Sequence, residues 1–263
     1  MSERRAKDEG RLRLHPRFPT GYLSTARDVI VYLPPGYHAA ADRYPVFYLQ
    51  DGQNLFDPAT AFGGQDWRAD ATADELILSG AIPPMLLVGV YNTGVRRISE
   101  YTPTRDAQKR KGGKGDRYAQ MLARELKPFI DAEYRTRRGV LDTGVGGSSL
   151  GGLAAIEAGL LYPRVFGKVA VMSPSVWWDQ RSILGMVRRF SGGTRPHIWL
   201  DTGTEEGDAP PQVVEDARLL RDVLLERGWR EGEDLVYREY AGAGHNERAW
   251  GARFGEVLMG LWR

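Results

Sequence analysis

The sequence predicts an α/β fold in which a mostly parallel central sheet of about eight strands has helices on both faces. Short apolar runs of strand length alternate with longer amphipathic patterns of helical period along most of the chain. Several of these runs are continuously apolar, which is typical of parallel strands that are buried on both faces. The first three runs follow one another without a helical pattern between them. We therefore expect the sheet to begin as an antiparallel meander that leads into the parallel part.

The apolar runs and the amphipathic patterns give the positions of the expected strands and helices along the chain. Strands are expected at Arg11–Leu14, Asp28–Leu33, Pro45–Leu49, Met85–Val90, Thr143–Gly147, Val169–Met172, His197–Asp201 and Leu235–Glu239. One apolar stripe covers Tyr118–Tyr134, and Pro128 within it should kink that helix or begin a new first turn. Further helical patterns run over residues 153–161, 213–224 and 254–261. Because sheets of this kind bind ligands beyond the carboxyl ends of their strands, a site is expected in the loops at that edge.

Length and charge indicate one domain with two basic segments. The chain has 263 residues, of which 42% are hydrophobic, and this is enough for a full core. Residues 1–17 hold six Lys/Arg against three acids, and residues 105–117 hold six against two. We expect residues 1–17 to be a basic, partly mobile extension and residues 18–263 to be a single domain. Since the basic segments are a terminus and a glycine-rich loop, we expect them to be solvated and expect no nucleic-acid partner.

The composition excludes several classes of site. The absence of cysteine rules out disulfides, thiol nucleophiles, iron–sulfur clusters and cysteine zinc sites, and four histidines leave few metal ligands or bases. The apolar runs fall far short of the roughly 18 residues that a membrane span requires. Residues 1–13 contain no apolar stretch that would serve as a secretory signal. We therefore expect a cytoplasmic protein with no membrane partner.

The most informative stretch is Gly147–Gly151, which matches the pattern G-x-S-x-G between a strand and a helical pattern. Such an elbow holds its central serine, Ser149, in a strained turn, and it needs glycine on both sides because a side chain would meet the neighbouring strand or helix. The helix N-terminus that follows favours developing negative charge. Alternatively, the stretch is a Gly/Ser-rich loop whose serine only caps the helix. Ser148 fits the pattern less well because Leu150 is not glycine, and a phosphate loop would need a lysine.

A serine nucleophile needs a base, and the chain order of this elbow class places that base after Ser149. Only two histidines meet this condition. His197 begins a strand and therefore lies at the amino edge of the sheet. His245 follows the last expected strand in a glycine-rich loop at the carboxyl edge, so we expect it to be the base; its alternative is a surface residue that caps the next helix. His15 and His38 lie upstream and are expected to be exposed.

The acid is expected in the loop that follows the strand His197–Asp201, where four carboxylates lie close together. Glu206 is preferred because it comes after the turn at Gly203, where the chain can bend towards the elbow. Asp201 and Asp208 remain open as alternatives, since composition alone does not separate the three.

An oxyanion hole requires two backbone N–H donors that point at the developing oxyanion. We expect the N–H of Leu150, directly after the nucleophile, to be one of them. The other is expected from Gln53, in the loop after the strand Pro45–Leu49, where Gly52 allows a close approach of the backbone.

Together these pieces resemble the putative esterase family of α/β-hydrolases, which includes feruloyl esterases, enterochelin and salmochelin trilactone esterases, and mycolyltransferases. The matching segments, spread over about residues 20–260, are Val31–Tyr37, Tyr48–Phe56, Arg97–Pro103, Gly147–Gly152, Ser173–Trp178, Gly203–Glu206 and Gly244–Asn246. The resemblance implies an α/β-hydrolase fold with Ser149 as nucleophile, His245 as base and Glu206 as acid, since Glu206 aligns with the acid of the family's G-T-x-D/E loop. The chain departs from the family at Asp51-Gly52, where many members have His-Gly.

The chemistry that this resemblance implies is two-step acyl transfer without a metal or organic cofactor. The expected function is therefore a serine esterase that cleaves a small-molecule ester through an acyl-enzyme. The alternatives are an acyltransferase of the same fold and a non-catalytic protein, either an α/β-hydrolase-like binding protein or a polyanion binder.

Aromatic and basic residues near the carboxyl edge bear on the substrate. The aromatic residues in the expected loops there are Phe56, Trp67, Trp177, Trp178 and Trp250. If two or more line the cleft, a flat aromatic or sugar-like ester is favoured; the alternative is that they pack beneath long loops. Arg96, Arg97 and the basic segment 105–117 are candidates to meet an anionic substrate or to form a mobile lid.

Overall fold

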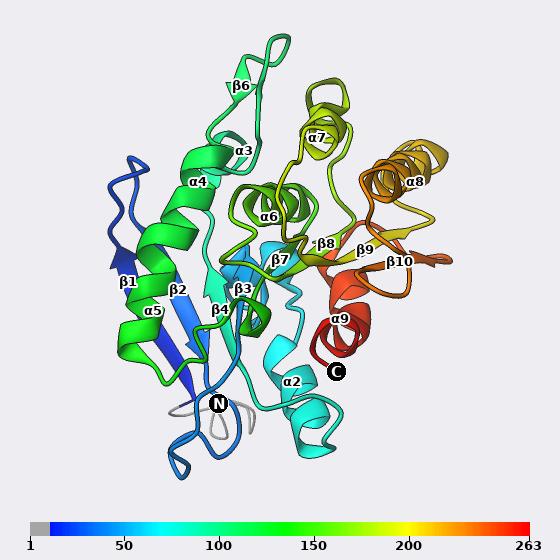
Figure 1. The fold of residues 1–263 in the computed structure, drawn as a ribbon. Coiled ribbons are helices and arrows are strands. Elements are labelled where there is room, and N and C mark those ends of the chain that lie inside the picture. The colour runs from blue at the N-terminus through cyan, green and yellow to red at the C-terminus, as the bar shows by residue number, and fades with distance from the viewer. Residues whose placement is uncertain (1–10) are drawn as a thin grey trace.

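The computed structural model describes residues 11–263 and contains an eight-stranded sheet with helices on both faces (Figure 1). In spatial order its strands are β1 (Leu12–Phe18), β2 (Arg27–Tyr32), β4 (Leu86–Val90), β3 (Val46–Gln50), β7 (Thr143–Ser148), β8 (Lys168–Met172), β9 (His197–Gly203) and β10 (Leu235–Tyr240). A separate small hairpin consists of β5 (Arg105–Asp106) and β6 (Lys111–Gly112). The predicted fold class is confirmed, and each expected strand is present with its ends moved by a few residues.

The antiparallel start of the sheet differs from the expected meander. β2 pairs antiparallel with β1 and with β4, whereas β3 pairs parallel with β4 and β7. β3 is therefore not the neighbour of β2. Helix α2 (Ala69–Leu78), which the sequence analysis did not predict, connects β3 to β4 as a crossover, and a crossover makes these two strands parallel.

The helices lie in two layers that cover opposite faces of the sheet (Figure 1). One face is covered by α4 (Gly115–Met121), α5 (Lys127–Glu133), α6 (Leu150–Leu161), α7 (Trp178–Arg188) and α8 (Pro210–Glu226). The other face is covered by α2 and α9 (Glu247–Trp262). Successive residues of β3 point to opposite faces of the sheet, as the two-residue period of a strand requires. Val46 and Tyr48 pack on the face covered by α4 to α8, and Phe47 and Leu49 pack on the face covered by α2 and α9.

Pro128 has the effect that its position predicted. α4 runs into a π-helical turn over Leu122–Leu126, and α5 follows with Pro128 in its first turn. The three segments form one unbroken helical run, and at the π-helical turn the N–H of Lys127 bonds to the carbonyl of Leu122 five residues back, so the helix widens directly before the residue that lacks an N–H.

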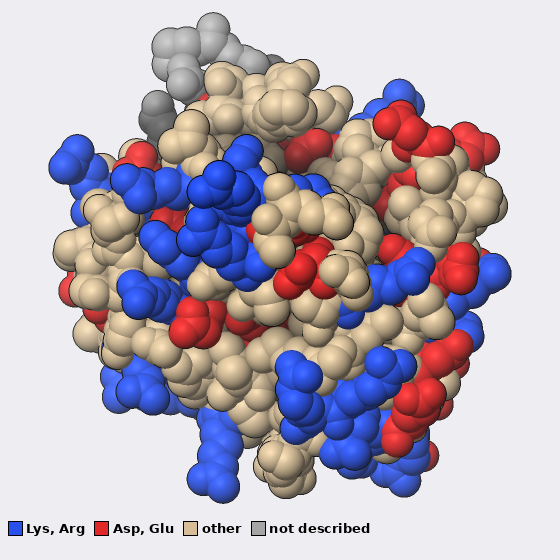
Figure 2. Space-filling model, turned by 90° about the horizontal axis from the view of Figure 1, so that it is seen from above, with Lys and Arg blue, Asp and Glu red and all other residues tan. Residues whose placement is uncertain are grey.

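Both basic segments contain regular secondary structure where the structure describes them. β1 begins at Leu12, so the last residues of the expected extension belong to the sheet, and the part of that extension formed by residues 1–10 lies outside the described residues. Segment 105–117 forms the β5–β6 hairpin and the start of α4. Figure 2 shows Lys and Arg side chains on the top of the molecule in separate groups, with Asp and Glu between them. Within residues 11–263, no helix is long and apolar enough to cross a membrane.

Candidate active site

The turn between β7 and α6 has the geometry of a strained elbow. Ser149 separates the strand from the helix with φ 59° and ψ −126°, a backbone conformation that costs a non-glycine residue of order 1–3 kcal/mol. A Cβ on Gly147 would lie 2.9 Å from the Cβ of Gln50 and 2.9 Å from the carbonyl carbon of Gly151. A Cβ on Gly151 would lie 3.0 Å from the Cβ of Gln50. The expected reason for both flanking glycines, close contact with the neighbouring strand and helix, is confirmed.

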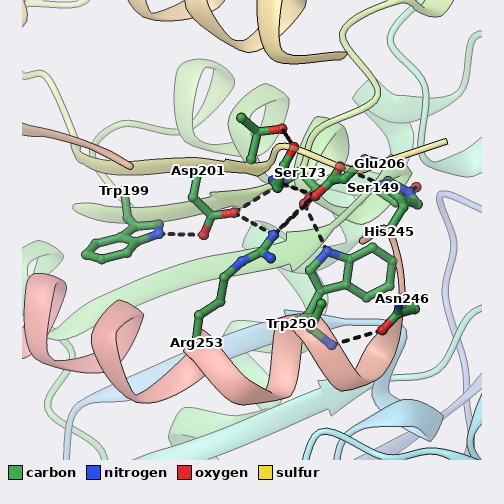
Figure 3. Close-up of polar contacts among 12 residues, drawn as sticks. Ser149, Ser173, Trp199, Asp201, Glu206, His245, Asn246, Trp250 and Arg253 are labelled. Atoms are coloured by element: carbon green, nitrogen blue, oxygen red, sulfur yellow. Dashed lines mark hydrogen bonds and ion pairs between the residues drawn. The ribbon is translucent and has the colours of Figure 1, made fainter. Parts of the chain in front are cut away.

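Three side chains from separate loops form a continuous hydrogen-bonded chain. Nε2 of His245 lies 2.9 Å from Oγ of Ser149, and Nδ1 of His245 lies 2.8 Å from Oε2 of Glu206 (Figure 3). His245 lies between β10 and α9. The side chain of Asn246 accepts a hydrogen bond from the N–H of Ala249 and so fixes the start of α9 directly after the histidine. The sequence-predicted serine, histidine and first-choice acid are therefore brought together.

The other two candidate acids lie elsewhere. Asp201 is buried in β9, where its carboxylate binds Arg253 and the indole N–H of Trp199. Asp208 is exposed in the loop that follows. His197 begins β9 at the amino edge of the sheet, as predicted.

Glu206 is ionised at neutral pH even though its side chain is fully buried. Burial raises the pKa of this carboxyl, but hydrogen bonds from His245, the Ser173 hydroxyl and the Gly203 N–H lower it, and the balance leaves the pKa below its ordinary value. The histidine thus contacts a carboxylate, which can stabilise an imidazolium.

Ser149 opens into a cavity of about 530 Å³. Its lining residues are Asp51, Gln53, Asn54, Thr60, Phe62, Asn92, Gly94, Arg97, Ser148, Ser149, His245, Glu247 and Trp250. Gln53 lies on this wall in a short helical turn after β3, and Leu150 is the first residue of α6, where backbone N–H groups have no partner within the helix. Their role as oxyanion donors stays a prediction. Gly52 is required for a different reason: a Cβ there would collide with the backbone of Gly89 in β4.

Asp51, where the family often has histidine, holds an arginine in the cavity wall. Arg97 donates from Nε and Nη2 to the two carboxylate oxygens of Asp51 at 2.8 and 2.7 Å, and Asn92 donates to the same carboxylate at 2.7 Å. Arg97 lines the cavity as predicted. Because the guanidinium of Arg97 is already paired with the carboxylate of Asp51, much of its positive charge is compensated before any anionic substrate binds.

The structure does not place four predicted substrate residues on the cavity wall. Phe56 and Trp67 are buried in the core beneath α2 and α9. Trp178 is buried and donates its indole N–H to the carbonyl of Thr104, and Trp177 is 47% exposed with the ammonium of Lys109 over its ring. These expectations are wrong because the apolar rings either fill the space between a helix layer and the sheet or support the basic hairpin. Segment 105–117 is also absent from the cavity's lining residues.

Of the aromatic residues expected near the cleft, Trp250 does line the cavity, and it packs edge-on against His245 with ring centroids 4.8 Å apart. Two other residues of the site were missed by the sequence analysis. Glu247 and Phe62 line the cavity without having been singled out. The sequence held a signal for Phe62, which stands directly before Gly63 and Gly64, and the structure leaves it 80% exposed.

A mostly parallel sheet whose central strand ends in a serine elbow, with histidine and carboxylate in loops at the same edge, defines an α/β-hydrolase. The chain belongs to the family described as Putative esterase, whose model matches residues 20–261. With that membership the protein is a carboxylic ester hydrolase.

Similar proteins agree with this assignment. The ferri-bacillibactin esterase BesA of Bacillus subtilis is 27% identical over 227 residues, which cover 77% of this chain and 73% of the relative. The crystal structure of the BES protein from Bacillus cereus has a TM-score of 0.73 at 20% identity and covers 97% of this chain and 95% of its own. A ferulic acid esterase structure has a TM-score of 0.75 at 19% identity and covers 96% and 98%. At these identities the two structures show a shared fold.

Proposed function

We propose that this protein is a serine esterase that works through an acyl-enzyme, with Ser149 as nucleophile, His245 as general base and Glu206 as the acid that orients the base. The observation that carries the proposal is the unbroken chain of two hydrogen bonds, 2.9 and 2.8 Å long, from the strained serine to the buried carboxylate. All three residues lie at one edge of the sheet, and the serine and histidine face the same cavity.

The geometry supports the following sequence of steps. Oγ of Ser149 attacks the ester carbonyl while Nε2 of His245 takes its proton, and the carboxylate of Glu206 stabilises the imidazolium. The N–H groups of Leu150 and Gln53 are the proposed donors to the oxyanion. His245 then returns the proton to the departing alcohol as the ester bond breaks. Water activated by His245 hydrolyses the acyl-serine, which releases the carboxylic acid and restores the serine.

The proposed substrate is a small-molecule ester that reaches Ser149 through the 530 Å³ cavity. Relatives named for ferri-bacillibactin, enterobactin and triacetylfusarinine C, together with feruloyl esterases, supply the first esters to test. The cavity wall carries Arg97, Asp51 and Glu247, so hydrogen-bonding groups near the scissile bond are expected to help binding.

A fluorophosphonate probe and p-nitrophenyl acetate test the proposal together. The native protein should be labelled and should hydrolyse the ester. Ser149→Ala should abolish both, and His245→Ala should abolish hydrolysis while circular dichroism shows an unchanged fold. Labelling that persists in Ser149→Ala, or full activity in His245→Ala, would contradict the assignment.

A further inference from the structure

A buried polar cluster lies beside Glu206, and one of its members, Trp250, also packs against His245 (Figure 3). It consists of Ser173 after β8, Asp201 in β9, and Trp250 and Arg253 on α9, and all four residues are buried. The proposed reaction assigns no step to these side chains. A buried guanidinium and carboxylate lose much hydration, so their presence at this place needs an explanation.

The two oxygens of Glu206 face different partners. Oε2 contacts His245. Oε1 accepts a hydrogen bond from the Ser173 hydroxyl at 2.5 Å and from the Gly203 N–H at 2.7 Å, and it lies 3.5 Å from Nη2 of Arg253. Every group on the Oε1 side is therefore a donor or a cation, and each of them stabilises the carboxylate in its ionised form.

The direction of the Ser173 hydroxyl is fixed by its other neighbours. Nη2 of Arg253 and Nε1 of Trp250 lie 2.5 and 2.9 Å from Oγ of Ser173. Guanidinium and indole groups only donate hydrogen bonds, so the serine oxygen accepts from both. Its single hydrogen is left for Glu206.

Arg253 is itself held from the opposite side. Nη2 donates to Oδ1 of Asp201 at 2.9 Å, and the other oxygen of Asp201 accepts from Trp199 at 2.8 Å. The guanidinium thus bridges Asp201 and Ser173, which places its positive charge beside the acid of the catalytic chain.

We propose that Ser173 and Arg253 are positioning residues of this site, which hold Glu206 as an oriented carboxylate and thereby set the pH at which the Glu206–His245 pair takes up a proton. The inference rests on the proposed function and deepens it. Without the serine hydrogen or the guanidinium charge, the negative charge of the pair is less stabilised. The pair then binds its first proton at a higher pH, whichever of the two residues carries it.

Other charged or titratable groups also surround the pair and stay in place in the test. Asp51, Arg97 and Glu247 line the same cavity as His245, and the ring of Tyr240 lies under the guanidinium of Arg253, 5.1 Å from its Cζ. A change that follows the removal of a single buried hydroxyl is therefore due to that hydroxyl, as long as these neighbours are unaltered.

The test compares Ser173→Ala with Thr143→Val, which removes one buried hydroxyl at the far end of β7, where it donates to the Gly139 carbonyl. The apparent pKa of the His245 imidazole, followed by NMR, should rise by about one unit in Ser173→Ala. At pH 7 kcat/KM for p-nitrophenyl acetate should fall severalfold and by no more than about 10-fold, through kcat rather than KM, and its acid limb should move to higher pH. Thr143→Val should show none of these changes.

A second variant tests the guanidinium. Asp201→Asn combined with Arg253→Gln removes both charges of the buried pair and leaves neither one alone, and it should move the imidazole titration in the same direction. If Ser173→Ala does not fold, Ser173→Gly suits the φ of 42° at this position and makes the same comparison.

The outcomes separate the inference from the proposed function. An unchanged imidazole titration and acid limb in folded Ser173 variants would overturn the inference while the esterase proposal stands. A wild-type protein without esterase activity whose imidazole pKa still rises in Ser173→Ala would overturn the proposed function and leave the link between Ser173 and the Glu206–His245 pair in place.

Discussion

Two glutamates of this protein are almost equally buried but hold their protons very differently. Glu206 is 0% exposed and its pKa lies below the ordinary value, because three hydrogen bonds outweigh the effect of burial. Glu157, on α6, is 2% exposed, and burial raises its pKa to about 8, helped by the nearby charge of Asp116. Oε2 of Glu157 has no hydrogen-bond partner within residues 11–263. Burial alone therefore yields a neutral acid, and the donors around Glu206 make it a carboxylate suited to a relay.

The largest expected effect comes from removing the charge of Glu206. Glu206→Gln keeps the shape of the side chain but cannot stabilise an imidazolium, so kcat should fall by about 10⁴-fold. Steady-state kinetics with p-nitrophenyl acetate measure the loss. A fall of less than tenfold would mean that another carboxylate serves the histidine.

The same variant should lose stability with a defined pH dependence. The folded-state pKa of Glu206 lies below its unfolded value, so its contribution is present above the unfolded pKa and is lost as the pH falls through the folded one. In urea unfolding, the gap between wild type and Glu206→Gln should be widest near neutrality and should narrow below about pH 4. A gap that grew on acidification would contradict the lowered pKa.

Glu157→Gln should show the opposite sign. The folded-state pKa of Glu157, about 8, lies above the ordinary value of 4.5, so the wild type loses stability as the pH rises between them. Glutamine stays neutral, so the variant does not lose this stability. The free energy of unfolding of the variant minus that of the wild type should be roughly 3 kcal/mol larger at pH 9 than at pH 5. Urea unfolding at both values checks it, since all other titrating groups are common to the two proteins. Parallel pH profiles would show that Glu157 titrates normally.

Gly115→Ala tests how tightly the Glu157 site is packed. A Cβ on Gly115 would collide with Oε2 of Glu157, so the carboxyl must move or α4 must shift, at a cost of about 1–3 kcal/mol. Gly193→Ala is the matched control, because a Cβ there would meet nothing within 4 Å. Equal thermal midpoints for the two variants would argue against the close packing of α4 on α6.

The smallest effect is expected at Asp208, the alternative acid of the same loop. Its side chain is exposed, so Asp208→Asn should leave kcat unchanged within twofold and stability within about 0.5 kcal/mol. A large loss of kcat in this variant, combined with a small loss in Glu206→Gln, would exchange the roles of the two residues.

Local rules made part of the site predictable from the sequence. The elbow at Ser149 needs glycines at fixed spacing, and chain order left His245 as the base at the carboxyl edge of the sheet. Glu206 was preferred over Asp201 and Asp208 because it follows the turn at Gly203 and because it matches the acid of the esterase family's loop. The strand order was harder, since the α2 crossover that makes β3 and β4 parallel was not predicted and the sequence does not show that β4 lies between β2 and β3.

What escaped prediction depends on contacts between distant segments. The sequence pattern around an aromatic residue does not show whether the ring faces a cleft, as that of Trp250 does, or fills the core, as that of Trp67 does. The contact between Ser173 and Arg253 joins residues 80 positions apart, and only the fold shows it. The cytoplasmic location and the division into an extension and one domain stay predictions.

The most direct test of the catalytic assignment is a rapid-mixing experiment with a p-nitrophenyl ester, followed by mass spectrometry of the quenched protein. An acyl-enzyme mechanism through Ser149 predicts a burst of nitrophenol equal to the protein concentration when deacylation limits the rate, and an acyl group on the peptide that contains Ser149. In Ser149→Ala both signals should vanish. An acyl group on another residue, or ester hydrolysis that continues unchanged in Ser149→Ala, would contradict the assignment.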